Sequence, residues 1–380
     1  MEVELYSADQ FDEIPWPETE EADLLRRYMA PMVENGTLHF IENADSEVGF
    51  VKVGEVVLPF TVASKGGLNS YVVAPKTHYV DYSRDELRHM SSRAMRWLAQ
   101  VAITPIDLLC RWGRMNRVVM INNWLLSTNL FPPGFDGAKA EAVLAALKER
   151  FPDHTLVIRS VDLGLRRALF ESLQRIGAKM VMSRRVHLNM RDDRSIWKRN
   201  NVKNDGRLQR KTPYEQLQHD EITEAEMPRI KELYDLLYLD KYSRLNPKFT
   251  EAMLLHLWRQ RLWEFKAWRL NGRIDAVSAT IRVGEVRTAP LVGYDTALDR
   301  ELGLYRLAYL DIIEYGRSGN ETIHGSAGVA AYKQGRGAQS FFEYNAVVND
   351  HLSLRRRLPW MLLGWITYRV VGPMMERENL

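Results

Sequence analysis

The segment that decides the fold is Glu321–Asn349, ETIHGSAGVAAYKQGRGAQSFFEYNAVVN. Its β-forming residues and glycines predict a strand, a turn, a short helix, a second glycine break and a closing strand. Upstream, WEFKAWRL, RIDAVSATIRV and EVRTAPLVGY predict three strands, and an amphipathic helix follows them before Tyr315. The second half of the chain therefore has the order strand, strand, strand, helix, strand, helix, strand.

The first half of the chain ends in a similar pattern. A strand TLVIRS, a helix that closes at Gly177 and a strand MVMSRRVHL repeat the order strand, helix, strand. Before them, residues 38–80 are rich in β-forming residues, with turns at Gly54 and at Gly66-Gly67, and predict an antiparallel meander. Residues 85–115 predict a helix that breaks near Pro105. The chain thus reads as two similar α/β halves.

The composition indicates what broad class of protein this is. A chain of 380 residues suggests two domains, and 46% hydrophobic with 27% charged residues is ordinary for a globular protein. A net charge of +3 is too small to indicate nucleic-acid binding, although residues 184–211 are locally basic. Cys110 is the single cysteine, so an internal disulfide and a cysteine-based metal site are excluded, and we expect no metal. The start lacks the pattern of a secretory signal and no long apolar run follows, which favours a cytoplasmic protein.

On this element order, and on Tyr332-Lys333 in its last helix, the second half resembles the GNAT acyltransferase fold. More narrowly, it is similar to the FemABX branch of aminoacyl transferases and their acetyltransferase-like relatives. The resemblance implies two GNAT-like domains in tandem, with mixed central sheets flanked by helices. We place them at residues 1–192 and 193–350, followed by a tail at 351–380.

The same resemblance implies a reaction. An acyl or aminoacyl group would pass to a small-molecule amine, forming an amide bond. No bound cofactor is expected, because the activated donor is a co-substrate: acyl-CoA, acyl carrier protein or aminoacyl-tRNA. Acyl carrier protein and tRNA are accordingly the expected macromolecular partners.

The phosphate-binding motif of GNAT folds, Arg/Gln-x-x-Gly-x-Gly/Ala, is matched in part at residues 299–305. Arg300 and Gly303 fit, whereas Tyr305 replaces a small residue. Backbone N–H groups at a helix N-terminus bind phosphate there, so a bulky Tyr305 disfavours plain acetyl-CoA. The alternative is an ordinary helix start with an acidic first turn.

The helix near residue 332 carries the expected catalytic groups. The resemblance implies that Tyr332 protonates the leaving group, that Lys333 stabilises developing negative charge, and that Arg336 helps to bind the donor. The alternative is that Tyr332 packs while Lys333 and Arg336 are solvated.

His324 and Ser326 form a His-Ser pair at a strand end, but a Gly-x-Ser-x-Gly elbow is missing, which disfavours a hydrolase. We expect His324 to be either a base for the acceptor amine or a buried core histidine. Glu343 on the last strand is the second candidate base. Ser326 is assigned to the acceptor side.

Two further groups are candidate binding residues. The basic segment before Leu208 predicts a donor-binding stripe with spacing of four, which suits a tRNA or a nucleotide tail or is a solvated helix face; it comprises Arg199, Lys203 and Arg207. Tyr238 and Tyr242 lie in a polar, aromatic helix end that the resemblance places over the acceptor, or they belong to the core.

The tail, residues 351–380, places Arg355, Arg356 and Arg357 before an apolar segment with Trp360 and Trp365. It predicts either contact with an anionic membrane surface, peripheral to the inner membrane, or a helix docked on the first domain. Two alternative functions stay open beside the acyltransferase. One is a catalytically inactive GNAT pair that binds or scaffolds, and the other is a peripheral membrane enzyme acting on lipid-linked amines.

Overall fold

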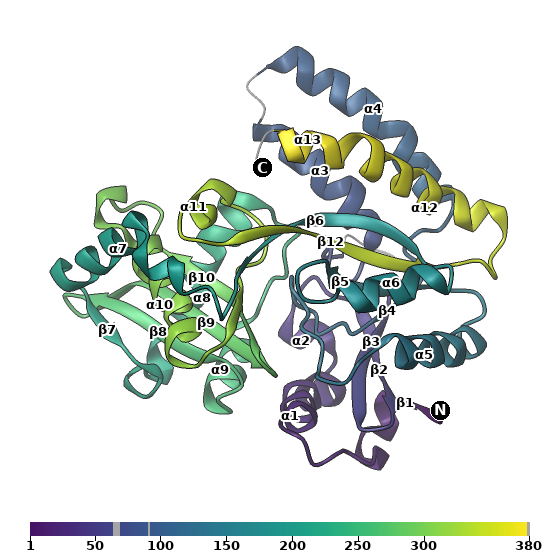
Figure 1. Cartoon of the computed structure of the whole chain (residues 1–380), viewed down its shortest axis with the longest axis horizontal. Coiled ribbons are helices and arrows are strands. Elements are labelled where there is room, and N and C mark those ends of the chain that lie inside the picture. Colours follow the sequence, from purple (N-terminus) through teal and green to yellow (C-terminus); the bar gives the residue numbers. More distant parts are fainter. Residues whose placement is uncertain (64–68, 90–91, 378–380) are drawn as a thin grey trace. The chain divides into compact units, whose positions relative to one another are not determined.

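The computed structural model describes residues 1–63, 69–89 and 92–377 (Figure 1). Contacts divide the chain into two units. The first unit comprises Met1–Arg184, Leu245–Lys248 and the chain from Phe342 through the C-terminal helices. The second unit comprises Arg185–Arg244 and Phe249–Phe341. The domain boundaries expected from the sequence stay a prediction.

The first unit is built on a mixed sheet. Strands β1 to β4 pair antiparallel in sequence order, β4 pairs parallel with β5, and β5 pairs antiparallel with β12. The strands are β1 (Val3–Ser7), β2 (Ser46–Val53), β3 (Val56–Ala63), β4 (Val118–Ile121), β5 (Thr155–Asp162), β6 (Lys179–Asn189, shared with the second unit) and β12 (Gln339–Val348, likewise shared). The helices are α1 (Glu20–Asn35), α2 (Thr37–Phe40), α3 (Tyr82–Glu86), α4 (Arg93–Trp112), α5 (Gly137–Arg150), α6 (Arg167–Arg175), α12 (Leu354–Ile366) and α13 (Gly372–Arg377).

The core of the first unit lies on both faces of this sheet. Alternate residues of β4 point to opposite faces, as the period of a strand requires. Val119 and Ile121 pack with Leu144 of α5, and Val118 and Met120 pack with Trp360 of α12. Because both faces are covered, all four residues of β4 are buried.

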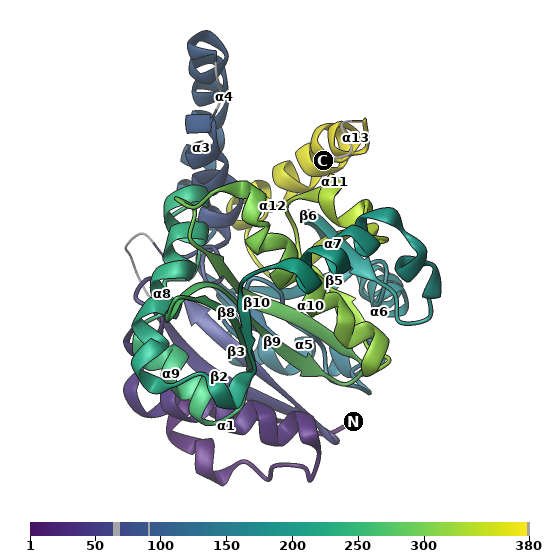
Figure 2. The same ribbon diagram turned by 90° about the vertical axis from the view of Figure 1, so that its left-hand side faces the viewer.

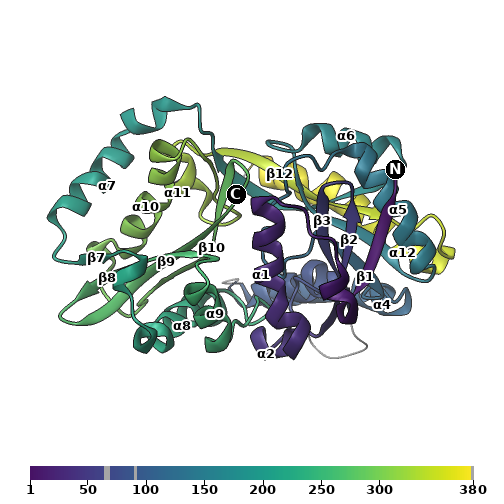
Figure 3. The ribbon, with the colours of Figure 1, turned by 90° about the horizontal axis from the view of Figure 1, so that it is seen from below.

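The second unit is a smaller mixed sheet between two layers of helices. Figure 3 shows α7, α10 and α11 on one side of β8–β10, and α8 and α9 on the other. The strands are β7 (Glu215–Leu217), β8 (Glu264–Leu270), β9 (Arg273–Val283), β10 (Val286–Tyr294) and β11 (Thr322–His324). The helices are α7 (Asn200–Lys211), α8 (Met227–Asp235), α9 (Glu251–Arg259), α10 (Leu304–Ser318) and α11 (Ala330–Gln334). Helix α10 buries Leu304, Leu307 and Ala308, which share one face, against Ile323 of β11.

The predicted strand–helix–strand endings are confirmed in both halves, as β5–α6–β6 and β11–α11–β12. The last strand of each half also completes the other sheet. Residues 343–348 of β12 pair with β5 in the first unit, and Leu188 and Asn189 of β6 pair with β11 in the second. Each unit is therefore assembled from distant parts of the chain.

Three predictions of local structure are wrong. Residues 71–81 form no strand in the described chain, because Val73 N–H and Ala74 N–H both donate to the Ser70 carbonyl in a turn, and a π-helical segment (Thr77–Asp81) follows. Residues 37–40 are helical. Helix α4 continues through Pro105, which lies on its exposed side, where water can satisfy the freed carbonyl. The predicted turn at Gly66-Gly67 lies outside the described residues.

The tail docks on the first unit, as one of its two alternatives predicts. Trp360 and Leu363 of α12 are buried in the core with Cys110. Placing Trp360 at a membrane surface is therefore wrong, whereas Trp365 is exposed. Among the described residues, no helix is long and apolar enough to cross a membrane.

Candidate functional site

The second unit contains two parallel strands that part. β10 and β11 pair over three residues only, from Val286 with Thr322 to Thr288 with His324. β11 then ends, while β10 continues to Tyr294, and the register of β10 against β9 shifts between Thr288 and Leu291. Beyond Thr288, the edge of β10 no longer has β11 beside it. Such an edge presents backbone N–H and C=O groups that an extended ligand can pair with.

The N-terminus of α10 is the next α-helix start after β10 in the chain, beyond the connection at residues 295–303. Its N-cap is Gly303 at φ 66°, a left-handed conformation, and a Cβ there would lie 2.5 Å from Leu208 Cδ2. Glycine is therefore required at this position on two grounds. In the described chain no side chain caps α10, so the positive end of the helix is open to an anion. Arg300 lies in the exposed turn before it, Arg300–Leu302. Arg300 and Gly303, two of the predicted donor-binding residues, thus lie together at this helix start.

Three tyrosines pack against one another beside this helix start. Tyr305 and Tyr309 of α10 lie 5.0 Å and 5.4 Å from Tyr332 of α11, measured between ring centroids. The Tyr332 hydroxyl is buried and has no hydrogen-bond partner among the residues that the structure describes. Burial raises the pKa of Tyr332 above its usual value, so the hydroxyl stays protonated. It is available as a proton donor.

Lys333 is buried and holds the backbone after β11. Its ammonium donates to the carbonyl oxygens of Gly325 at 2.5 Å and Ala327 at 2.8 Å. The segment from Ser326 to Val329 turns sharply, with positive φ at Ser326 (56°), Gly328 (80°) and Val329 (45°). The alternative that Lys333 is merely solvated is wrong. In this structure its contacts fix a strained turn.

Two buried histidines lie near Lys333. The Ser326 N–H donates to His324 Nδ1 at 3.2 Å, so a neutral His324 carries its own proton on Nε2. His187 of β6 lies 3.0 Å from the Ser340 hydroxyl through Nδ1. Burial, with the positive charges of Lys333, Arg185 and His324, lowers the pKa of His187 to about 4. The sequence did not indicate His187, because β6 lies far from this segment along the chain.

Arg336 is paired rather than solvated. Its Nε and Nη2 atoms donate to the Asp205 carboxylate at 2.5 Å and 3.0 Å, and Arg306 Nε donates to the same group at 2.7 Å. The guanidinium also lies 3.5 Å from the centroid of the Tyr332 ring. Asp205 is buried on α7, so it ties the basic helix to α10 and to the chain after α11. Arg336 thereby positions Tyr332.

The remaining candidate binding residues of the second unit are more exposed to solvent. Arg199, Lys203 and Arg207 are all exposed; Lys203 and Arg207 lie on α7, and Arg199 is its N-cap residue. Tyr238 and Tyr242 lie in a π-helical segment, Leu236–Tyr242, that continues α8. Lys241, between them, donates to the hydroxyl of Tyr294 at the end of β10.

Glu343 belongs to the part of β12 in the first unit. Its carboxylate is buried and accepts from Arg184 Nε at 2.9 Å and Nη2 at 3.2 Å. Arg184 also donates to Thr128 Oγ1 at 2.9 Å. The charge of Glu343 is thus matched by an adjacent guanidinium.

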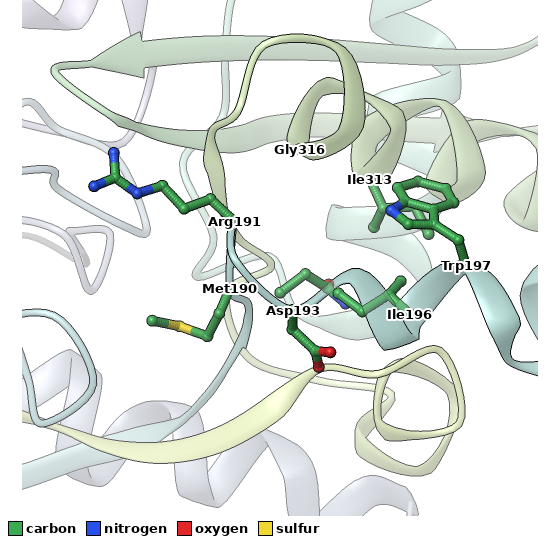
Figure 4. Close-up of a pocket in the computed structure, with 8 residues that line it drawn as sticks. Met190, Arg191, Asp193, Ile196, Trp197, Ile313 and Gly316 are labelled. Carbon is green, nitrogen blue, oxygen red and sulfur yellow. The ribbon is translucent and has the colours of Figure 1, made fainter.

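One pocket of the second unit is too small for an acyl group. It is lined by Asn189, Met190, Arg191, Asp193, Ile196, Trp197, Ile313 and Gly316 (Figure 4). Its volume of about 10 Å³ is room for roughly one water. A wider surface hollow of about 410 Å³ follows α8 and is lined by Glu232, Asp235 and Asp240 among others. Its acidic lining disfavours a phosphate-bearing donor. Among the described residues, no group of three or more His, Cys, Asp or Glu side chains is placed to hold a metal ion.

Known proteins resemble this chain in fold and, over part of its length, in sequence. No curated protein matches the sequence. Residues 198–341 match the family described as acetyltransferase (GNAT) domain. The crystal structure of FemX is 9% identical, covers 96% of this chain and 100% of its own, and has a TM-score of 0.54. A tandem GNAT protein from the clavulanic acid biosynthesis pathway is 12% identical, with 91% and 98% coverage and a TM-score of 0.41. L-PGS from Bacillus licheniformis is 12% identical, with 62% and 78% coverage and a TM-score of 0.44.

Of these three structures, the FemX match alone is close enough to support the fold, and it spans nearly the whole chain. It confirms the predicted class, a mixed α/β protein with two GNAT-like halves in tandem. Over residues 198–341 the chain is similar to the acetyltransferase (GNAT) domain family, and nearly its whole length has the fold of FemX.

Proposed function

We propose that this protein is an acyltransferase that moves an acyl or aminoacyl group from an activated donor to an amine. The observation that carries the proposal is the parting of β10 and β11 in the same domain as the open N-terminus of α10. The edge of β10 can pair with an extended amide chain of the donor, and the helix start can accept its phosphate. The GNAT match over residues 198–341 supports the same reading.

The chemistry requires one bond to form and one to break. The lone pair of the amine attacks the acyl carbonyl carbon, and the bond from that carbon to the thioester sulfur or ester oxygen breaks. The leaving atom takes up a proton, and the amine nitrogen loses one to solvent. An uncharged amine attacks without a base, so the site needs one acid.

Tyr332 is the acid in this proposal. Its hydroxyl is protonated at neutral pH and makes no described hydrogen bond, so proton transfer breaks no existing contact. The Arg336 guanidinium over its ring stabilises the phenolate that forms. His324, with its proton on Nε2, acts here as a hydrogen-bond donor rather than as the base.

The donor is proposed from the surfaces near the helix start. Tyr305 occupies the place of a small residue, which favours an acyl carrier protein or an aminoacyl-tRNA over plain acetyl-CoA. The exposed Arg199, Lys203 and Arg207 suit a polynucleotide backbone. If they bind tRNA, replacing all three with Ala lowers affinity and flattens its salt dependence, by a slope of roughly one for each phosphate that is no longer neutralised.

The test begins with donor binding. Native mass spectrometry of the full chain is done with CoA, acyl carrier protein loaded with an acyl group, and aminoacyl-tRNA, each separately. The donor that binds is then mixed with a panel of amines, and the amide product is identified by mass. If none of the three binds, the proposal fails and the alternative of an inactive GNAT pair is favoured.

Tyr332→Phe is the matched variant for the mechanism. This variant removes only the hydroxyl oxygen, which makes no hydrogen bond in the described chain, so stability and donor binding should be unchanged. Turnover should fall by about 100-fold or more if the hydroxyl protonates the leaving group. Unchanged turnover would show that the ring only packs.

A further inference from the structure

Helix α4 extends away from the sheet of the first unit, as both Figure 1 and Figure 2 show. Only its C-terminal end packs on the unit, where Cys110 is fully buried and Gly113 lies against Pro359 of α12. From Arg93 to Ala102 almost every residue is exposed. Within the first unit this helix is thus held at one end.

The outward side of α4 is apolar. Its exposed fractions are 65% for Trp97, 50% for Val101, 61% for Leu108 and 49% for Trp112. At about 100° per residue, these four side chains fall within roughly 60° of the helix circumference. The side that packs on the unit carries Asp107 and Cys110, and Ile103 and Ile106 pack against the same core as Cys110. A surface helix normally has one apolar side, which points inward, so the second, exposed apolar side of α4 is unusual.

Helix α12 of the docked tail also has one buried apolar side and one exposed apolar side. Helix α12 points Trp360 and Leu363 into the core, and Leu354, Met361 and Trp365 remain exposed along its other side. Tyr368 extends this row into a π-helical segment, Thr367–Val371. The two helices meet where Arg355 donates to the Trp112 carbonyl at 2.6 Å.

The charged residues of α4, of α12 and of the segment after α12 are nearly all basic. Residues 93–112 and 354–371 together carry seven arginines (Arg93, Arg96, Arg111, Arg355, Arg356, Arg357 and Arg369) and one acidic residue, Asp107. Asp107 is buried and paired with Lys76 and Arg111. A second copy of the chain would bring arginine against arginine, which disfavours self-association. An anionic surface would instead attract these arginines while its apolar layer accepts the exposed apolar side chains.

We propose that the first unit binds an anionic lipid bilayer through the outward side of α4, with the exposed row of α12 and the segment after it as a second contact. A helix with Trp and Leu on one side and Arg on its flanks lies in the headgroup region, with tryptophan rings at that level. Phosphate groups of the lipids pair with the flanking arginines. The proposal concerns where the protein acts and does not depend on its reaction.

The test is co-sedimentation of the full chain with phosphatidylcholine vesicles that contain or lack 30% phosphatidylglycerol. We expect binding to the anionic vesicles, weakened by salt, and a blue shift of tryptophan emission. Replacing Trp97 and Leu108 together with Ser should lower affinity at least about tenfold. Replacing Arg93 and Arg96 with Gln should reduce the preference for anionic vesicles.

The matched control is Leu38→Ser in α2 of the same unit, an apolar residue that is also exposed, at 49%; this variant should bind as the parent does. All the substituted side chains are exposed, so circular dichroism should confirm unchanged folding. Absence of binding to anionic vesicles at low salt would overturn the proposal. So would full binding by the Trp97 and Leu108 variant. Light scattering that shows a dimer, broken by the same two substitutions, would reassign this side of α4 to a protein interface.

Discussion

Replacing Lys333 with Met should unfold the turn that follows β11. The methionine has nearly the length of the lysine stem but cannot donate, so the carbonyls of Gly325 and Ala327 are both left without the ammonium bond. The site is buried, at 4% exposure, and water cannot readily replace the donor. The positive φ angles at Ser326 and Val329 then lack the interaction that compensates them.

The magnitude follows from the two bonds. An orphaned buried carbonyl costs about 1–3 kcal/mol, and removing a buried ammonium returns part of its desolvation cost. We therefore expect the free energy of unfolding to fall by about 2–4 kcal/mol, a factor of roughly 30 to 700 in the equilibrium constant. This loss is structural and would occur whether or not Lys333 takes part in catalysis.

Urea denaturation measures the loss, and hydrogen exchange locates it. Exchange should accelerate in peptides covering residues 322–338 before it does so in β8 or β9. The control is Lys203→Met, an exposed lysine of α7 in the same unit, which should change stability by no more than about 0.5 kcal/mol. If Lys333→Met is as stable as this control and its exchange is unchanged, the argument from the two carbonyls is wrong. A loss of turnover in that variant would then be chemical in origin.

Two further predictions concern the same domain. The pKa of His187 falls to about 4 from an ordinary value near 6.5, so the stability contributed by the neutral imidazole is complete above pH 6.5 and is lost as the pH falls toward 4. His187→Gln should therefore flatten the pH dependence of the urea midpoint between pH 6.5 and pH 4. An unaltered slope in that range would contradict this prediction. Gly337→Ala should lower the free energy of unfolding by about 2–4 kcal/mol, because φ is 90° and the new Cβ would lie 2.7 Å from Ile196 Cγ1. Gly272→Ala, at φ 80° with open space around it, isolates the conformational part and should cost only about 1–2 kcal/mol; equal losses in the two variants would rule out the clash.

Local chemistry made much of the fold predictable. Asn271 and Gly272 join β8 and β9 with φ angles of 51° and 80°, the pair of positive values that an Asn-Gly hairpin turn requires. In the hairpin between β2 and β3, Gly54 supplies a positive φ of 58°. The order of strands and helices after residue 264 follows from apolar periodicity, which burial on one side of each helix preserves.

What the sequence did not reveal depends on contacts between distant segments. The β-forming residues Tyr71–Ala74 were predicted as a strand, yet the Ser70 and Tyr71 N–H groups donate to the Asn43 and Leu245 carbonyls instead of a sheet neighbour. The pairing of β12 with β5, and of β6 with β11, likewise has no local signal. Asp205 of α7 was not singled out from the sequence, although it accepts hydrogen bonds from both Arg306 and Arg336.

The same reasoning explains why Lys333 was predicted as catalytic and is found bound to backbone. A lysine next to a tyrosine in a glycine-rich turn fits either role, and only the positions of the carbonyls distinguish them. Three interactions fix the end of β11: Thr288 Oγ1 donates to the His324 carbonyl, Gly325 N–H donates to the His187 carbonyl, and Lys333 donates to the Gly325 carbonyl. Because β11 can go no further, β10 runs on beyond it. The opening proposed to hold the donor therefore depends on Lys333 even if its ammonium never contacts the reacting atoms.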